Sequence, residues 1–167
     1  MKELIFNQSD IPKDQWRYGF RSSAAVGCGW IATHNALRLM GYETDIPELI
    51  RYYERQLPLY HGNAGTCFWG PAILFRQWGF PLKVSVKPAE YDRLAKDADA
   101  CILFYHWRKK WALGAHFVAL HHTDKGFVGY NTYTNSKGPD YYGDSLSAFL
   151  KRRKYFATFL IAIRKKR

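Results

Sequence analysis

One cysteine of the chain stands where a nucleophile is expected. Cys28 lies between Gly27 and Gly29 and opens a helix-forming segment, residues 28–40, whose apolar positions suit one buried face. Free backbone N–H groups at a helix start favour negative charge, so this position is expected to lower the thiol pKa and favour the reactive thiolate. The segment therefore predicts a nucleophile if a base and an orienting group join it. Without them, Cys28 is a small packing residue under a helix.

A histidine and an asparagine further along the chain can supply those two roles. His116 begins one expected strand, and Asn131 lies in the next, after a turn at residues 123–126. A four-residue turn puts Asn131 directly opposite Val118. Asn131 is then the diagonal neighbour of His116 on the same face, and such neighbours are about 7–8 Å apart. A one-residue shift would put it on the other face. In the first register Cys28 is the nucleophile, His116 takes its proton, Asn131 holds the ring, and the N–H of Cys28 binds the oxyanion.

The other cysteines and histidines suggest no second site. The three cysteines include no Cys-x-x-Cys pair, which argues against a disulfide framework or a zinc site and favours the cytoplasm. We expect no cofactor and no metal. The residues expected to pack or to lack a partner are Cys67, Cys101, His34, His61, His106, His121 and His122.

Composition indicates one domain with a real core. The chain has 167 residues, of which 47% are hydrophobic and 17% aromatic, and we expect a single domain over 1–167 with its core at about 20–163. It has no apolar run that predicts a transmembrane segment or a secretory signal. The net charge of +11 includes a basic tail, 164–167, expected to be solvated and frayed, which offers an anionic surface a contact. No motif predicts specific nucleic-acid binding.

The order of elements, helices first and then mostly strands, predicts an α+β fold. Residues 3–6 are expected to form a short strand or an arm. Helices are expected at 28–40, 45–57, 70–78, 88–96 and 145–150, strands at 82–86, 101–105, 115–122, 127–133 and 156–163, and connections at 61–66, 107–114 and 135–143.

The same motifs, in this order, resemble a known family. They are Gly27-Cys28-Gly29, Gly65-Thr66, Trp78-Gly79-Phe80, the run His116 to Leu120, and the run Gly126 to Asn131. Together they resemble the papain-like cysteine peptidases, above all the compact bacterial double-glycine leader peptidases of bacteriocin exporters. The resemblance covers residues 20–163 and implies a papain-like fold, with N-terminal helices packed on an antiparallel sheet, and a peptide or protein substrate.

Two positions depart from the family pattern. The family's oxyanion glutamine falls at Ser22, and the nearest upstream glutamine is Gln15; Asn131 is followed by Thr132, where the family often has proline. The leading hypothesis is a thiol hydrolase that cleaves a peptide or isopeptide bond through an acyl-enzyme on Cys28. The alternatives are an acyl or amide transferase that uses the same Cys-His-Asn site, and a catalytically silent domain that binds a peptide or an anionic partner.

Overall fold

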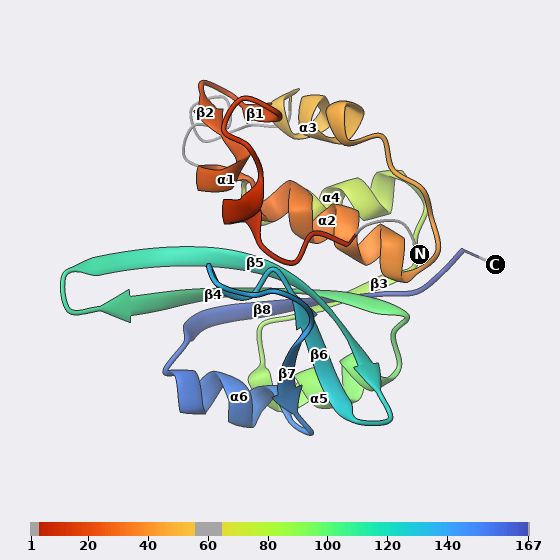
Figure 1. Ribbon diagram of the computed structural model, residues 1–167. Coiled ribbons are helices and arrows are strands. Elements are labelled where there is room, and N and C mark those ends of the chain that lie inside the picture. Colours follow the sequence, from red (N-terminus) through yellow and green to blue (C-terminus); the bar gives the residue numbers. More distant parts are fainter. Residues whose placement is uncertain (1–3, 56–64, 167) are drawn as a thin grey trace.

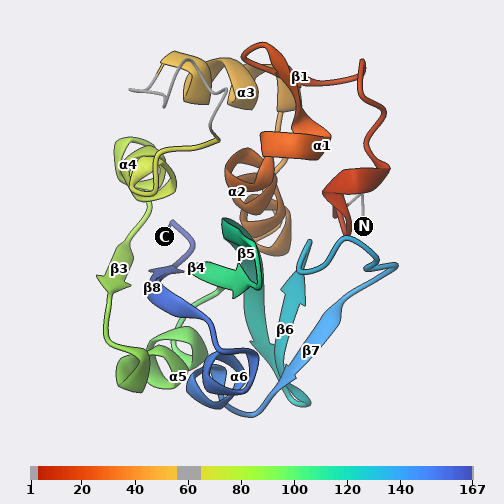
Figure 2. The same cartoon turned by 90° about the vertical axis from the view of Figure 1, so that its left-hand side faces the viewer.

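The protein is a three-layer α+β structure. The computed structural model describes residues 4–55 and 65–166; the first four residues of the expected connection 61–66 and the end of the helix expected at 45–57 lie outside these ranges. One antiparallel sheet lies between two layers of helices, with α1 to α4 over one face and α5 and α6 over the other (Figures 1 and 2). The predicted α+β class and antiparallel sheet are thus confirmed.

The described residues form six α-helices and one short 3-10 helix, η1. Their bounds are η1 (Gln8–Asp10), α1 (Ser23–Val26), α2 (Cys28–Leu39), α3 (Ile46–Arg55), α4 (Gly70–Gln77), α5 (Pro88–Lys96) and α6 (Leu146–Arg153). None of these helices has the length and apolar character needed to cross a bilayer.

Six strands make the main sheet in the order β3-β8-β4-β5-β6-β7, and two short strands pair beside α1. The bounds are β1 (Arg17–Tyr18), β2 (Arg21–Ser22), β3 (Leu82–Ser85), β4 (Ala100–Lys109), β5 (Ala112–Thr123), β6 (Gly126–Tyr130), β7 (Asp140–Gly143) and β8 (Phe156–Ile163). All neighbouring strands are antiparallel.

Local signals explain several of these elements. Asp45 accepts a hydrogen bond from the Glu48 N–H at 2.9 Å and caps α3, and Ser145 caps α6 by accepting from the Ala148 N–H at 3.3 Å. Pro88 opens α5, where its missing N–H costs nothing. The predicted bounds of α5 and β8 are confirmed.

Three expectations about elements are wrong. The expected connection 107–114 belongs largely to β4 and β5, which form a long hairpin turning at Lys110 and Trp111. Strand β6 ends at Tyr130 rather than at residue 133, and the expected loop 135–143 contains β7. Residues 4–6 form an arm, one of the two expected alternatives. The arm is held where the Ile5 N–H donates to the Asn35 side chain at 2.8 Å.

The two faces of the sheet carry separate hydrophobic clusters. On the face toward α2, alternate residues such as Phe104 and Phe117 pack against the helix, with Trp30 fully buried among them. On the opposite face, Tyr105 and Val118 pack toward α5 and α6. This alternation fixes which side of β5 each side chain occupies, because successive residues of a strand point to opposite faces.

The described part of the basic tail, residues 164–166, is docked rather than frayed. The Arg164 side chain donates to the Asp97 carbonyl at 2.9 Å, and the Lys165 N–H donates to the Asp99 carboxylate at 2.8 Å. Lys166 lies over the Phe80 ring, 4.5 Å from its centroid. The expectation failed because it weighed charge alone and not these acceptors, which lie far from the tail in sequence.

Candidate active site

The start of α2 is built so tightly that glycine is required on both sides of Cys28. A Cβ atom at Gly27 would lie 2.6 Å from the Ser23 carbonyl oxygen and from the Trp30 indole nitrogen, and one at Gly29 would lie 2.3 Å from Thr66 Oγ1. Cys28 is the first residue of α2 and is half-buried. The sequence prediction that the cysteine opens a helix is therefore confirmed.

The thiol of Cys28 is held neutral. Burial of the sulfur raises its pKa above the ordinary value, and the backbone N–H groups of Phe117 and Gly29, which favour the thiolate, offset only part of that increase. The expectation of a lowered pKa at the helix start is wrong. Desolvation by the packed surroundings outweighs the helix dipole here.

His116 has a defined tautomer. Its Nε2 lies 2.6 Å from the backbone carbonyl oxygen of Asn131; because a carbonyl only accepts, Nε2 carries the proton and Nδ1 is the basic nitrogen of the neutral ring. Burial lowers the pKa of His116, and this hydrogen bond opposes the shift. At neutral pH, His116 is thus an unprotonated base beside a sheet edge.

Asn131 contacts His116 through its backbone rather than through its amide. The predicted register of the β5–β6 hairpin is confirmed, with Thr123 paired with Gly126 and Ala119 with Tyr130, but the ladder ends there. Asn131 turns away with a φ of 62° and is not paired with Val118. The expectation that its amide orients the ring is therefore replaced by a carbonyl contact.

The amide of Asn131 binds Gln8, a residue that the sequence analysis missed. Gln8 donates its backbone N–H to Asn131 Oδ1 at 2.8 Å and accepts from Asn131 Nδ2 at 3.1 Å. Its own side-chain NH₂ donates to the Ala24 carbonyl at 3.0 Å. Gln8 thereby ties the His116 loop to α1, just before Cys28. No motif marked it, because its role depends on a contact across 123 positions of the chain.

Neither proposed oxyanion substitute contacts the cysteine. Ser22 belongs to β2, opposite Arg17, and Gln15 is exposed and lines a separate hollow beside Ile11. Among the hydrogen bonds of the described residues, none joins Ser22 or Gln15 to Cys28. The groups beside the sulfur are instead backbone N–H groups, those of Phe117, Gly29 and Cys28 itself.

The thiol and the imidazole lie toward different faces of the sheet and are not hydrogen-bonded, because successive residues of β5 point to opposite sides. The backbone of Phe117 meets the sulfur, while His116, the preceding residue of β5, packs its ring against Tyr105 with centroids 5.9 Å apart. Among the described contacts of Cys28 and His116, none is to the other. A cavity of about 600 Å³ lies beside the ring and reaches from Ala25 of α1 to Tyr155; Cys28 is not among the residues that line it.

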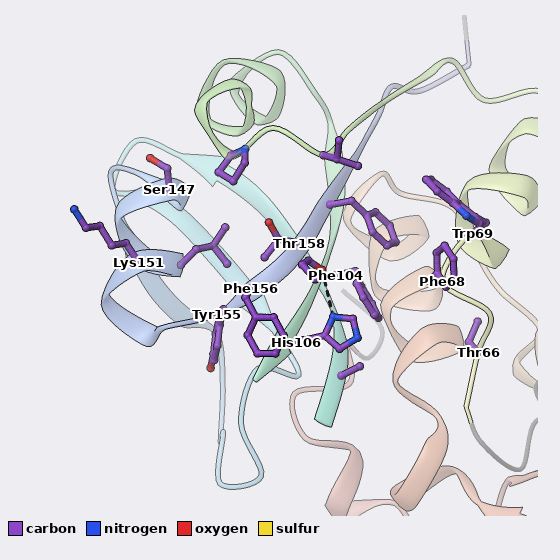
Figure 3. Close-up of a pocket in the computed structure, with 16 residues that line it drawn as sticks. Thr66, Phe68, Trp69, Phe104, His106, Ser147, Lys151, Tyr155, Phe156 and Thr158 are labelled. Atoms are coloured by element: carbon purple, nitrogen blue, oxygen red, sulfur yellow. Dashed lines mark hydrogen bonds between the residues drawn. The ribbon is translucent and has the colours of Figure 1, made fainter. Parts of the chain in front are cut away.

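A larger aromatic groove of about 920 Å³ extends from the segment before α4, past β8, to α6 on the other side of the sheet (Figure 3). It runs from Thr66, which packs on Gly29, to Lys151 of α6. The Trp69 and Phe159 rings stack in its wall with centroids 5.4 Å apart. The groove is therefore an apolar recess, and one end of it lies at Thr66, which packs on Gly29, the residue after Cys28.

His106 stands in this groove, although the sequence analysis expected no partner for it. Its Nδ1 donates to the Ala157 carbonyl at 3.3 Å, and its ring contacts Phe104 and Phe156. Ala157 holds a positive φ of 44° at this contact. The register between β4 and β8 shifts between Phe104 and His106, as at a β-bulge. Sequence patterns rarely reveal such bulges, so this contact of His106 was not predicted.

The other chemically active side chains form no second centre in the described ranges. Cys101 is fully buried, as predicted, whereas Cys67 is half-buried. His34 lies in the core side of α2, where its Nδ1 is 2.5 Å from Thr44 Oγ1. His61 lies outside the described residues. Within those residues, no three His, Cys, Asp or Glu side chains gather as a metal site requires.

No protein-family model matches the chain, and no curated protein matches it.

Proposed function

We propose that the protein is a thiol hydrolase of the papain-like cysteine peptidase class, acting on a peptide or isopeptide bond through an acyl-enzyme on Cys28. The observation that carries the proposal is the His116 tautomer: its proton is on the nitrogen bonded to Asn131, and its Nδ1 is free to accept one. A Cys–His pair needs this arrangement, because the base must take the thiol proton while its other nitrogen is held.

In this mechanism the resting site is a neutral pair. The Cys28 pKa is raised and the His116 pKa is lowered, so both groups are uncharged near neutral pH. Attack then requires general-base catalysis: the His116 side chain is first brought from its face of β5 to the sulfur, and Nδ1 accepts the thiol proton. The sulfur adds to the carbonyl carbon, and the C–N bond breaks as His116 gives that proton to the leaving amine. The N–H groups of Gly29 and Phe117, which already face the sulfur, favour the developing negative charge.

The test is acylation by an activated ester, p-nitrophenyl acetate, with peptide mapping of the acyl group. We expect a burst of nitrophenolate and acetylation of Cys28. His116→Ala should slow this step about a hundredfold or more. Cys67 is the control, because it is also a half-buried free thiol. Equal labelling of Cys67, or an unchanged rate in His116→Ala, would refute the proposal.

Addition of an amine or thiol acceptor extends the same assay. Faster loss of the acetyl group to the acceptor than to water would favour the transferase reading. The chemistry at Cys28 is the same until the second nucleophile enters.

A second candidate is a binding domain without catalysis, favoured by the absence of a Cys28–His116 hydrogen bond. In that case the groove beside Thr66 holds a peptide, and Cys28 serves only to pack α2 on β5. Cys28→Ser would then leave peptide binding unchanged, and no acyl-enzyme would form in the wild type.

A further inference from the structure

The β4–β5 hairpin extends beyond the body of the sheet. Its strands pair with each other as far as Lys109 and Ala112, but the β8 partner ends at Phe156, opposite His106, and β6 ends opposite Ala119. Residues 107–113, here called the hairpin tip, therefore have no further strand of the described chain beside them, and they project to one side in Figure 1. A two-stranded ribbon gains little from its own packing in water, so a projecting one is typically used for contact.

Large apolar side chains are exposed at this tip. Trp111 is 90% exposed and Leu113 is 64% exposed. Tryptophan is the residue type most enriched at membrane–water interfaces, where its ring enters the headgroup layer.

A lysine lies over each tryptophan of the tip. Lys110 lies 5.7 Å from the Trp111 ring centroid, and Lys109 lies 5.6 Å from that of Trp107. Behind the tip is a hollow of about 580 Å³ with four cations and one aromatic ring in its lining. These residues are Arg108, Lys109, Lys110, Lys154 and Phe156.

Acidic residues are missing from this part of the chain. Residues 100–123 and 145–167 contain no aspartate and no glutamate. None of the hollow's cations forms an ion pair with a described acidic residue. A cluster of four like charges in one hollow repels itself and fits a ligand with several negative charges.

We propose that the hairpin tip binds an anionic lipid surface, with Trp111 and Leu113 in the interfacial layer and headgroup phosphates in the hollow behind them. This inference is independent of the thiol chemistry. A single-stranded nucleic acid fits less well, because it needs open aromatic faces for base stacking. Trp107 lies across Gly114, where an added Cβ atom would be 2.2 Å from its ring, and Leu113 offers no ring.

The experiment is flotation with phosphatidylcholine vesicles, with and without phosphatidylglycerol. We expect binding only to the anionic vesicles and loss of binding at high salt. Lys109→Gln with Lys110→Gln should weaken binding about thirtyfold, since each basic residue near an anionic surface contributes a factor of about five. Trp111→Ser should also weaken it.

Matched variants distinguish binding at the hairpin tip from a general effect of the protein's net charge. Lys125→Gln with Lys137→Gln removes the same charge away from the tip, and Phe20→Ser removes another exposed ring; both should bind as the parent does. Thermal unfolding checks that all variants fold. Equal losses in the two lysine pairs would overturn the proposal.

Competition distinguishes the other sources of negative charge. Tighter binding to a single-stranded oligonucleotide than to anionic vesicles would overturn the lipid assignment. So would displacement from vesicles by inorganic phosphate at constant ionic strength, because the ligand would then be a free anion.

Discussion

Replacing Gly29 with alanine should destabilise the protein, although the same change usually stabilises a helix. The new Cβ atom would lie 2.3 Å from Oγ1 and 2.4 Å from Cβ of Thr66, whereas carbon contacts are optimal at about 3.5–4.0 Å. Thr66 must therefore move by about 1 Å. It is only 8% exposed and its hydroxyl shares a 3.1 Å hydrogen bond with Tyr18, so little room is available.

The magnitude follows from two opposing terms. Overpacking of a tight site costs about 1–3 kcal/mol, and removing glycine from a helix gains up to about 1 kcal/mol. We expect a net loss of about 1–2 kcal/mol in the free energy of unfolding, which lowers the melting temperature by about 2–8 °C for a chain of this size.

Urea and thermal unfolding followed by circular dichroism measure this loss. Gly138→Ala is the control, because nothing lies within 4 Å of its added Cβ atom. Thr66→Gly in the Gly29→Ala background removes the clash and should show a favourable coupling of about 1 kcal/mol or more. A Gly29→Ala protein as stable as the parent would refute the close packing of α2 on Thr66.

Three further predictions follow from single contacts. His116 and His121 both have a pKa lowered chiefly by burial. Below about pH 6.5 the unfolded chain therefore binds more protons than the folded protein, and the free energy of unfolding should fall as the pH drops through that range. Replacing both histidines by glutamine should make this fall smaller, as measured by urea unfolding at several pH values. Ser145→Ala should cost about 1 kcal/mol in chemical unfolding, because it removes the α6 cap. Asn131→Gly should keep Cys28 acylation, because the carbonyl that holds His116 remains and glycine adopts the positive φ readily.

Each of these has a contradicting outcome. An unchanged pH profile in the double histidine variant would mean that other groups control acid sensitivity. A Ser145→Thr protein as unstable as Ser145→Ala would argue against capping, since threonine also caps helices. Loss of acylation in Asn131→Gly, with the fold intact, would show that the amide and not the carbonyl serves His116.

The sequence predicted those elements whose local pattern agrees with their final environment. Pro88 and an amphipathic spacing specify α5, and the mostly apolar run of residues 156–163 specifies β8. The turn at 123–126 also specifies the register of its hairpin, because turn length determines which residues pair. These features need no information from distant residues.

The features that the sequence did not predict depend on distant contacts or on solvent exposure. The hairpin tip, 107–113, is basic and exposed, so it lacks the apolar alternation that marks a strand. Asn131 leaves its strand where Gln8, 123 positions away, binds its amide. For Cys28, the helix start was predicted. Its pKa is raised rather than lowered, because packing around the sulfur removes it from water, and that packing cannot be read from the local sequence.

The position of β8 constrains the order in which the chain can fold during synthesis. Strand β3 has only β8 beside it in the sheet, and β8 also borders β4. While the ribosome is still adding residues before 156, β3 has no partner and β4 presents a bare hydrogen-bonding edge. Nascent chains with such edges are prone to pair with one another, so we expect the growing polypeptide to depend on chaperone protection until β8 emerges.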